Sequence, residues 1–286
     1  MTGGSPLWPV RLHHIRIDSA KPDNMIAFYR RGVGLADEPV GKDVTLLRGG
    51  ERRLLIGKGE TGTMPLIAFG FDNEPQLEAY RSYLQGKGFN LQPAPTPLFG
   101  EEAFALDDPD GRAVAFGVPI EPEEDGYDLL PGRLQHAVCA TTRLEKMAKF
   151  YLDGLGLLAS DWIREGDGDP TGEATAFFAR TDQEHHSFAA FRAPEARLDH
   201  HSYEVTCWDD IRDWSDHFGE MEVPIWWGPG RHGPGNNLFI MIEDPDGNKV
   251  EMSAELELMH RHMPYRTWPH EERSLNLWGN NAWMRS

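Results

Sequence analysis

Apolar residues recur at helical spacing between residues 144 and 155. They fall at positions i, i+3, i+4 and i+7, the pattern of a helix with one buried face. Thr142 and Glu145 have the spacing of a capping box at its start, and Gly154 suits its end. Strands are predicted at four apolar stretches, residues 133–140, 174–179, 187–191 and 238–242. The order is therefore strand, helix, then more strands.

The same pattern occurs twice along the chain. Residues 11–35 and 133–157 align without gaps at an offset of 122, and nine of the 25 positions are identical. Each half also ends in Asp-Pro-Asp-Gly, a tight turn between two strands. A second strand–helix unit begins near Leu66 in the first half and near Leu198 in the second. These repeats predict an α+β fold with two homologous domains, each built from two βαβββ modules in a curved, mostly antiparallel sheet barrel.

Domain boundaries follow from the repeat and from local composition. We expect an N-terminal domain at residues 1–118 and a C-terminal domain at residues 133–253. Residues 119–132 between them are acidic and contain Pro and Gly, as in an exposed linker. Residues 254–286 form a tail that is rich in aromatic side chains, which free tails rarely are. The tail is therefore predicted to dock on the body of the protein.

Charge and composition narrow the class of function. The 286 residues include 46 acidic and 28 basic side chains, a net charge of −18 that disfavours nucleic acid and anionic membrane surfaces as partners. No apolar run approaches the roughly 18–20 residues of a membrane helix, and no secretory signal is visible at the N-terminus. Two cysteines, Cys139 and Cys207, do not predict a disulfide framework. The sequence thus favours a cytoplasmic protein with a small-molecule partner.

The candidate chemistry lies in the second half, which holds ten of the twelve histidines. His136 lies on the first predicted strand of its domain, His201 on the first strand of the second module, and Glu251 on the last strand. If the curved sheet surrounds a cavity, side chains at these equivalent positions can point into it. Two imidazoles and one carboxylate, leaving open coordination positions, are the ligands of non-haem Fe(II) oxygenases. The pattern therefore predicts a metal site formed by these three residues.

The first half provides an internal control. His14 keeps the first histidine, but Ala115 stands where the carboxylate would be, and Ile67 or Ala68 stands where the second histidine would be. None of these replacements can bind metal, so a single site is predicted, in the second domain. A lone strand histidine is more often a hydrogen-bonded core residue than a ligand. The combination at homologous positions favours the metal.

Two further histidines stand beside unusual segments. His186 follows another histidine directly before an apolar strand. His232 lies in the loop Gly-Pro-Gly-Arg-His-Gly-Pro-Gly, residues 228–235. Loop histidines normally face water, but a glycine-rich loop suits backbone that folds closely over a ligand.

At this point three motifs resemble those of the type I extradiol ring-cleavage dioxygenases of the vicinal oxygen chelate superfamily. They are LQHAV at 134–138, LDHHSYEV at 198–205 and GPGRHGPGNNLFIMIEDPDGNKVEM at 228–252. The third is the most specific, because it fixes a histidine, a turn and a glutamate at matching spacing. The resemblance covers the whole chain. It implies two tandem vicinal oxygen chelate domains, of which the N-terminal one holds no metal.

The resemblance also implies a role for each candidate side chain. The implied ligands of Fe(II), or of Mn(II), are His136, His201 and Glu251. His186 would be the acid–base catalyst, His232 would hydrogen-bond the bound substrate or oxygen, and His200 would line the pocket. Met241 stands where the family usually has a tyrosine. This departure removes a phenol that could help to deprotonate the substrate.

Three further pocket positions bear on the substrate. Val138, Phe178 and Trp227 are all apolar at places where family members that accept a carboxylate can carry polar groups. This favours an apolar ring substituent, such as an aryl, alkyl or fused-ring group. The same three residues would also fit an ordinary hydrophobic core, and the sequence does not decide between the two.

The resemblance implies an iron-dependent extradiol dioxygenase. It would insert both atoms of O2 into a catechol-type diol with meta ring cleavage, in the degradation of aromatic compounds. A homo-oligomer is expected. Alternatives are a dioxygenase for a hydroquinone-type ring and a non-catalytic protein that binds an aromatic compound. A metal-dependent isomerase or transferase of the same superfamily is disfavoured, because it more often uses four protein ligands from two modules.

Overall fold

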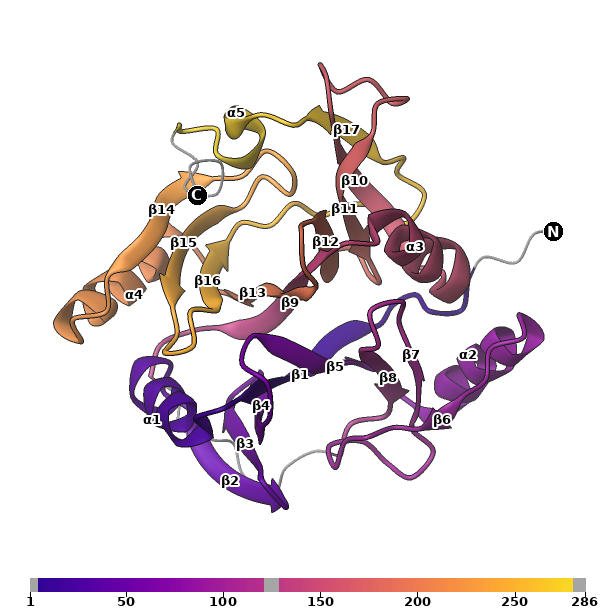
Figure 1. The fold of residues 1–286 in the computed structure, drawn as a ribbon, viewed down its shortest axis with the longest axis horizontal. Helices are drawn as coiled ribbons and strands as arrows, with labels where there is room; N and C mark the ends of the chain where they lie inside the picture. The colour runs from indigo at the N-terminus through magenta and orange to yellow at the C-terminus, as the bar shows by residue number, and fades with distance from the viewer. Residues whose placement is uncertain (1–4, 121–128, 280–286) are drawn as a thin grey trace.

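The computed structural model describes residues 5–120 and 129–279, and these form one sheet from each half of the chain (Figure 1). The described chain is a mixed α+β structure in which each half repeats the order βαβββ twice. This confirms the predicted fold class. Most of the predicted linker lies outside the described residues.

The first half forms an eight-stranded sheet. Its first module is β1 (Arg11–Ser19), α1 (Pro22–Gly32), β2 (Ala36–Gly41), β3 (Val44–Gly49) and β4 (Arg52–Lys58). Its second module is β5 (Thr63–Gly70), α2 (Glu74–Gly86), β6 (Gln92–Pro93), β7 (Phe104–Asp107) and β8 (Ala113–Gly117). The strand order is β2-β3-β4-β1-β5-β8-β7-β6.

The second half forms a nine-stranded sheet that also includes the tail. Its first module is β9 (Arg133–Thr141), α3 (Leu144–Ala148), the π-helix η1 (Lys149–Leu155), β10 (Leu158–Arg164), β11 (Ala174–Arg180) and β12 (Phe188–Arg192). Its second module is β13 (Arg197–Glu204), α4 (Trp208–Glu220), β14 (Ile225–Arg231), β15 (Leu238–Glu243) and β16 (Lys249–Ala254). The tail adds β17 (Arg266–Pro269), which pairs in parallel with β10, and α5 (Glu272–Leu275).

The helix predicted at residues 144–155 is present, but its ends differ from the prediction. The capping box does not form, because the helix begins after Arg143, whose N–H donates to Oγ1 of Thr141 at 3.0 Å. The helical segment ends at Leu155, and Gly156 leaves it in the left-handed conformation with φ of 86°. Gly156, rather than Gly154, therefore ends the helix, since a positive φ is the conformation that glycine adopts most readily.

Both sheets are curved and open at their ends. Consecutive strands after the helix of a module pair antiparallel, such as β3 with β4 and β15 with β16. The first strand of a module pairs in parallel with its last strand, as β1 does with β4 and β13 with β16. In Figure 1 the strands of the second sheet follow an arc from β14 to β17. Within the described strands no pairing joins the two ends of either sheet, so neither closes into a full barrel.

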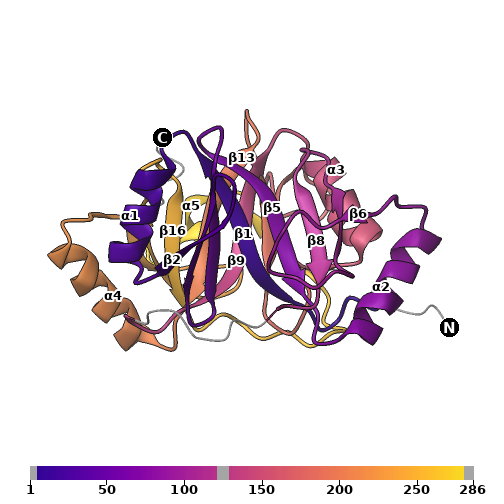
Figure 2. The same cartoon turned by 90° about the horizontal axis from the view of Figure 1, so that it is seen from below.

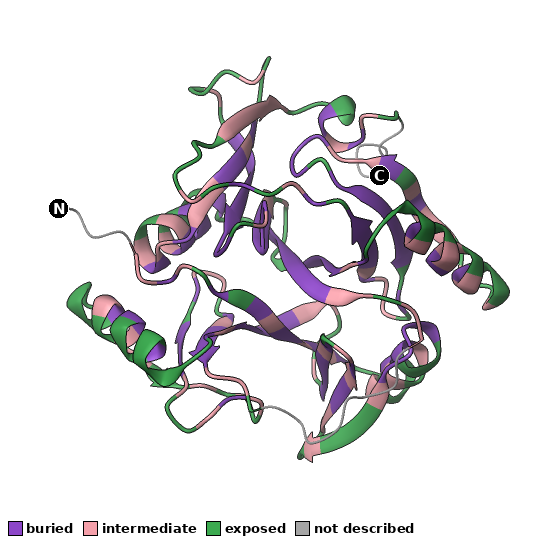
Figure 3. Ribbon diagram, turned by 180° about the vertical axis from the view of Figure 1, so that it is seen from behind, coloured by how far each residue is buried: buried purple, intermediate pink, exposed green. Residues whose placement is uncertain are grey.

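Helices α1 and α4 lie at one outer flank of the sheets and α2 and α3 at the other, as Figure 2 shows. The strands are largely buried, and the exposed positions concentrate on the helices and loops (Figure 3). Helix α4 buries Ile211, Trp214 and Phe218, which lie three and four residues apart on one face. None of the described helices is both long and apolar enough to cross a membrane.

The two halves contact each other through residues that the repeat conserves. Tyr29 of α1 donates a hydrogen bond to Oδ2 of Asp244 at 3.0 Å, and Tyr151 of η1 donates to Oδ2 of Asp108 at 3.1 Å. Tyr29 aligns with Tyr151, and Asp108 aligns with Asp244. Each helix therefore holds the Asp-Pro-Asp-Gly turn of the other half.

Candidate metal centre

Three adjacent strands of the second sheet, β9, β13 and β16, carry the candidate ligands. In their register His136 lies opposite Ser202, Ser202 lies opposite Glu251, and His200 lies opposite Val138. Side chains at paired positions point to the same face of a sheet. His136, His200 and Glu251 therefore share one face.

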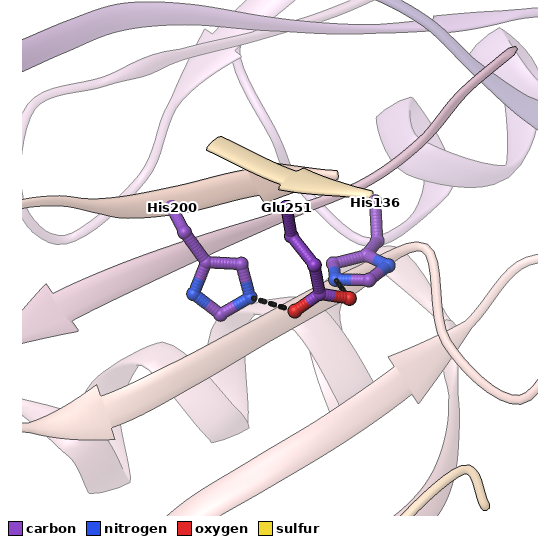
Figure 4. Close-up of side chains that lie close together, drawn as sticks. All are labelled: His136, His200 and Glu251. Atoms are coloured by element: carbon purple, nitrogen blue, oxygen red, sulfur yellow. Dashed lines mark ion pairs between the residues drawn. The ribbon is translucent and has the colours of Figure 1, made fainter. Parts of the chain in front are cut away.

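These three side chains converge, as Figure 4 shows. The Nε2 atom of His136 lies 3.8 Å from Oε1 of Glu251, and Nε2 of His200 lies 3.8 Å from Oε2. One nitrogen or oxygen atom from each residue lies within 4.8 Å of the others, and all three residues are buried. Among the described residues this is the one group of three or more potential ligands at such distances.

The structure corrects the predicted position of His201. His201 lies opposite Ala137 and Val250, on the other face of the sheet. Its ring packs 5.9 Å from that of Tyr29 and 5.4 Å from that of Tyr203. Neither ring nitrogen has a hydrogen-bond partner among the described residues. His200, which we expected only to line the pocket, takes the place beside Glu251.

The reason for the error is the period of a strand. Neighbouring residues point to opposite faces, so choosing the wrong member of a His-His pair reverses the face. The sequence did contain a signal: Tyr203 and Val205 share the face of His201, and both are core residues. Ser202, on the face of His200, donates a hydrogen bond to Oε1 of Glu251 at 3.2 Å.

Hydrogen bonds orient both imidazoles toward the centre. Nδ1 of His136 lies 2.5 Å from Oε1 of Gln135, and Nδ1 of His200 lies 2.7 Å from Oδ1 of Asp199. Both partners are acceptors, so each Nδ1 donates its proton to its partner and each ring turns Nε2 toward Glu251. Burial lowers the pKa of His136 to about 3, against the opposing effect of Glu251, so this ring is neutral at pH 7.

Glu251 is held as a charged group. Burial raises its pKa, but the neighbouring His232 and His136 outweigh that effect and leave the pKa at about 2. Asn237 donates to Oε1 at 3.3 Å, whereas Oε2 has no hydrogen-bond partner among the described residues. A buried carboxylate oxygen without a partner beside two lone pairs is the environment that a divalent cation completes.

Two further histidines, His186 and His232, lie beside the same three side chains. The ring of His186 lies 4.3 Å from that of His136, and Nε2 of His232 lies 3.5 Å from Oε2 of Glu251. Nδ1 of His232 donates to the carbonyl oxygen of Leu275 in the tail at 2.5 Å. Burial and then the neighbouring His136 lower the pKa of His186 well below its usual value, so it is neutral at pH 7.

A cavity of about 480 Å³ opens onto these residues. Phe178, Trp227 and Met241 line it, as expected, but Val138 is fully buried and packs behind Phe178. The cavity also has walls that the sequence did not predict, and these include Phe191, Asn237 and, from the tail, His270 and Leu275. The spacing of the motifs could not predict these tail residues, because the tail reaches the site only through the packing of β17 and α5.

Comparisons with known proteins agree with the resemblance of the three motifs. The model of the Glyoxalase/Bleomycin resistance protein/Dioxygenase superfamily matches residues 133–252. Metapyrocatechase 2 of Cupriavidus necator is 29% identical over 156 residues, which are 53% of this chain and 45% of that protein. The chain thus spans about half the length of this relative.

A second relative matches over most of both chains. The manganese-dependent 2,3-dihydroxybiphenyl 1,2-dioxygenase of Geobacillus genomosp. 3 is 23% identical over 84% of this chain and 83% of its own. Among solved structures, homoprotocatechuate 2,3-dioxygenase from Brevibacterium fuscum covers 100% of this chain and 94% of its own, with a TM-score of 0.79 and 20% identity. At this identity the structural match establishes the two-sheet fold.

Proposed function

We propose that this chain is a metal-dependent extradiol dioxygenase that opens the ring of a catechol, a proposal supported by the match of residues 133–252 to the model of the Glyoxalase/Bleomycin resistance protein/Dioxygenase superfamily. The observation that carries the proposal is the group of His136, His200 and Glu251 on one face of the sheet. Two imidazoles and a carboxylate supply three ligands and leave open positions for a diol and O2.

The residues present fit a divalent metal. Nε2 of His136 faces Oε1 of Glu251 and Nε2 of His200 faces its free Oε2, each at 3.8 Å. The Nδ1 atoms of the two rings are held by Gln135 and Asp199. These side chains suit Fe(II) or Mn(II) equally. When bound, either ion would hold the two diol oxygens and O2 together and favour the deprotonated diol.

The side chains of the protein would then handle protons and exclude water. His186 would accept a proton from the diol at Nε2 and return it later, as general acid–base catalysis requires. His232 stacks on Phe239, with ring centroids 3.9 Å apart, and its Nε2 faces Glu251. It would hold an oxygen of the bound substrate by a hydrogen bond.

The cavity walls support an apolar ring substituent. Phe178, Phe191, Trp227 and Leu275 line one continuous space with the candidate ligands. Met241 lies opposite Glu251 in the register of β15 and β16 and is fully buried, so it presents a thioether rather than a phenol to the site. A 3-aryl or 3-alkyl catechol would bury its substituent against these side chains.

The experiment is a panel of catechols offered to protein loaded anaerobically with Fe(II) or with Mn(II). We expect oxygen uptake and a coloured ring-opened product with one of the two metals, and higher kcat/KM for 3-phenyl or 3-alkyl catechols than for a carboxylated catechol. Glu251→Gln is the matched control, because it keeps the shape of the side chain and removes the charge. Equal turnover by this variant, or no oxygen uptake with any catechol, would refute the proposed function.

A further inference from the structure

A row of hydrogen bonds joins three buried side chains. It begins at an aspartate beside the C-terminal tail and ends at the candidate acid–base histidine. Nε2 of His185 lies 2.9 Å from Oδ2 of Asp161, and Nδ1 of His185 lies 2.9 Å from Nδ1 of His186. All three residues are buried, and His186 lines the cavity. Neither Asp161 nor His185 lines the cavity, so both can influence a bound molecule only through His186.

The directions of these hydrogen bonds follow from what each atom can donate. Asp161 accepts from Nε1 of Trp268 at 2.9 Å and from Nε of Arg266 at 2.9 Å, as an ionised carboxylate does. Nε2 of His185 must therefore carry a proton and donate it to Asp161. In a neutral ring this leaves a lone pair on Nδ1 of His185, which accepts from Nδ1–H of His186.

The consequence appears at the far nitrogen of His186. With its proton on Nδ1, the neutral ring has its lone pair on Nε2. Among the described residues no hydrogen bond involves this atom. If these hydrogen bonds ran in the opposite direction, Nε2 of His186 would carry the proton, and His186 would be a donor toward the cavity instead.

We propose that Asp161 and His185 are positioning residues that fix the tautomer of His186, so that its basic nitrogen Nε2 faces the substrate. This inference deepens the proposed function and rests on it. The diol O–H bond breaks, its proton forms the Nε2–H bond of His186, and the electron pair stays on the diol oxygen. The resulting imidazolium later returns the proton to an oxygen of the product. A carboxylate that orients a catalytic imidazole is a known catalytic arrangement, and here the imidazole of His185 stands between the carboxylate and His186.

Side chains of the C-terminal tail hold Asp161 in this arrangement. Arg266 and Trp268 belong to β17, and Arg266 also pairs with Glu257 at 2.6 Å. The backbone N–H of His185 donates to the carbonyl oxygen of Glu257 at 2.9 Å. Burial raises the pKa of Asp161, but its hydrogen bonds from His185 and Arg266 outweigh this and leave the pKa below the usual value. Asp161 thus stays charged at neutral pH.

Three variants separate the possible roles. In Asp161→Asn the amide can donate to His185 and reverse these hydrogen bonds, so that His186 carries its proton on Nε2. In His185→Gln the amide N–H still donates to Asp161 and the amide oxygen still accepts from His186, so the tautomer is kept. In His185→Phe both hydrogen bonds are lost. His14→Gln is the control, because His14 is a buried, hydrogen-bonded histidine of the first half.

The first measurement is independent of catalysis. Nitrogen-15 NMR of histidine-labelled, metal-free full-length protein reports which ring nitrogen carries the proton, with His186→Phe to assign the signal. We expect Nδ1–H for His186 in the wild type and in His185→Gln, and Nε2–H in Asp161→Asn. Nε2–H in the wild type would overturn the proposal, as would an unchanged tautomer in Asp161→Asn.

The second measurement is kinetic. We expect kcat to fall by about two decades or more in Asp161→Asn and His185→Phe, the usual range for a disabled acid–base group, while metal content and diol KM stay near wild type. His185→Gln and His14→Gln should keep kcat within about fivefold, far less than the loss of an acid–base group. If Asp161→Asn does not fold, the contrast between the two His185 variants decides, and equal activity of those two would refute the proposal. If the wild type opens no catechol, the proposed function fails, whereas the NMR result still decides the tautomer.

Discussion

The two halves of the molecule have the same strand register but opposite chemistry on one sheet face. In the second half, His136 and Glu251 both lie opposite Ser202. In the first half, His14 and Ala115 both lie opposite Ala68 in the same way. The backbone therefore places a potential site in both halves, and only the side chains decide whether one exists.

The sheet face that carries the candidate ligands in the second half is filled by apolar side chains in the first half. Leu66 occupies the position of His200, and it belongs to an apolar cluster with Leu46, Leu55, Ala68, Phe99, Ala105 and Ala115. His14, the one residue kept from the ligand set, turns Nε2 to the hydroxyl of Thr96 at 2.7 Å. It is a hydrogen-bonded core histidine, which is the ordinary role of a buried histidine. The comparison shows that a binding site here requires polar side chains at all three positions.

Among the substitutions that test this comparison, the largest effect is expected on metal affinity, from changes at His200 and His201. His200→Leu should lower metal affinity by more than about 100-fold, since even partners of ligands cost 10–100-fold. His201→Leu should leave metal binding unchanged, because its ring faces Tyr29 and Tyr203 on the other side of the sheet. Calorimetric titration with Fe(II) or Mn(II) under anaerobic conditions measures both. Loss of metal in His201→Leu with retention in His200→Leu would restore the ligand set predicted from the sequence.

The next largest effect is expected from moving the carboxylate into the first half. Ala115→Glu would bury a charge among Leu66 and Phe99 with no lone-pair partners and should lower the free energy of unfolding by about 3–5 kcal/mol. Glu251→Ala should cost the metal-free protein far less. Denaturant unfolding of both variants gives the two values, and a stable Ala115→Glu variant would show that the first face is not closed.

A smaller effect is expected from the turn aspartates, which have different partners in the two halves. Asp108 is paired with the charged side chain of Arg112, whereas the side chains that donate to Asp244 are the neutral amide of Asn248, at 2.9 Å, and the hydroxyl of Tyr29. Burial raises the pKa of Asp244 to about 6, against these hydrogen bonds. The folded state therefore binds a proton more tightly than the unfolded state does, so this group's contribution to stability is present below about pH 4 and lost as the pH rises to about 6.

This contribution can be isolated by difference. Between pH 4 and pH 7 the wild type should lose about 2 kcal/mol of unfolding free energy relative to Asp244→Asn. Asn248→Arg, which copies the partner of Asp108, should flatten the same profile. A wild-type profile parallel to that of Asp244→Asn would contradict the difference between the two turns.

The smallest effect is expected at the tyrosines that join the halves. Tyr29→Phe and Tyr151→Phe each remove one buried hydrogen bond to a carboxylate, which should cost about 1–2 kcal/mol. Tyr29→Phe should cost more, because Asp108 keeps its arginine when Tyr151 loses its hydroxyl. Thermal unfolding of the two single variants measures this, and a larger loss in Tyr151→Phe would reverse the expected order.

The sequence by itself determined the repeat, the βαβββ order and the half that carries the chemistry. These follow from local patterns: helical periodicity, matched positions such as Tyr29 and Tyr151, and the concentration of histidines after residue 130. His136, His186, His232 and Glu251 were also placed in the site by sequence motifs, and the structure brings them together.

Only the tertiary structure decided the rest. Whether His200 or His201 faces the cavity depends on which residues of β9 and β16 lie opposite them, because a strand alternates its faces and one position reverses the choice. Asp161, Trp268 and the tail carbonyl of Leu275 come from segments far along the chain that meet the histidines only through strand pairing and packing. Local spacing carries no information on such contacts, because they arise from the way in which the whole sheet folds around the site.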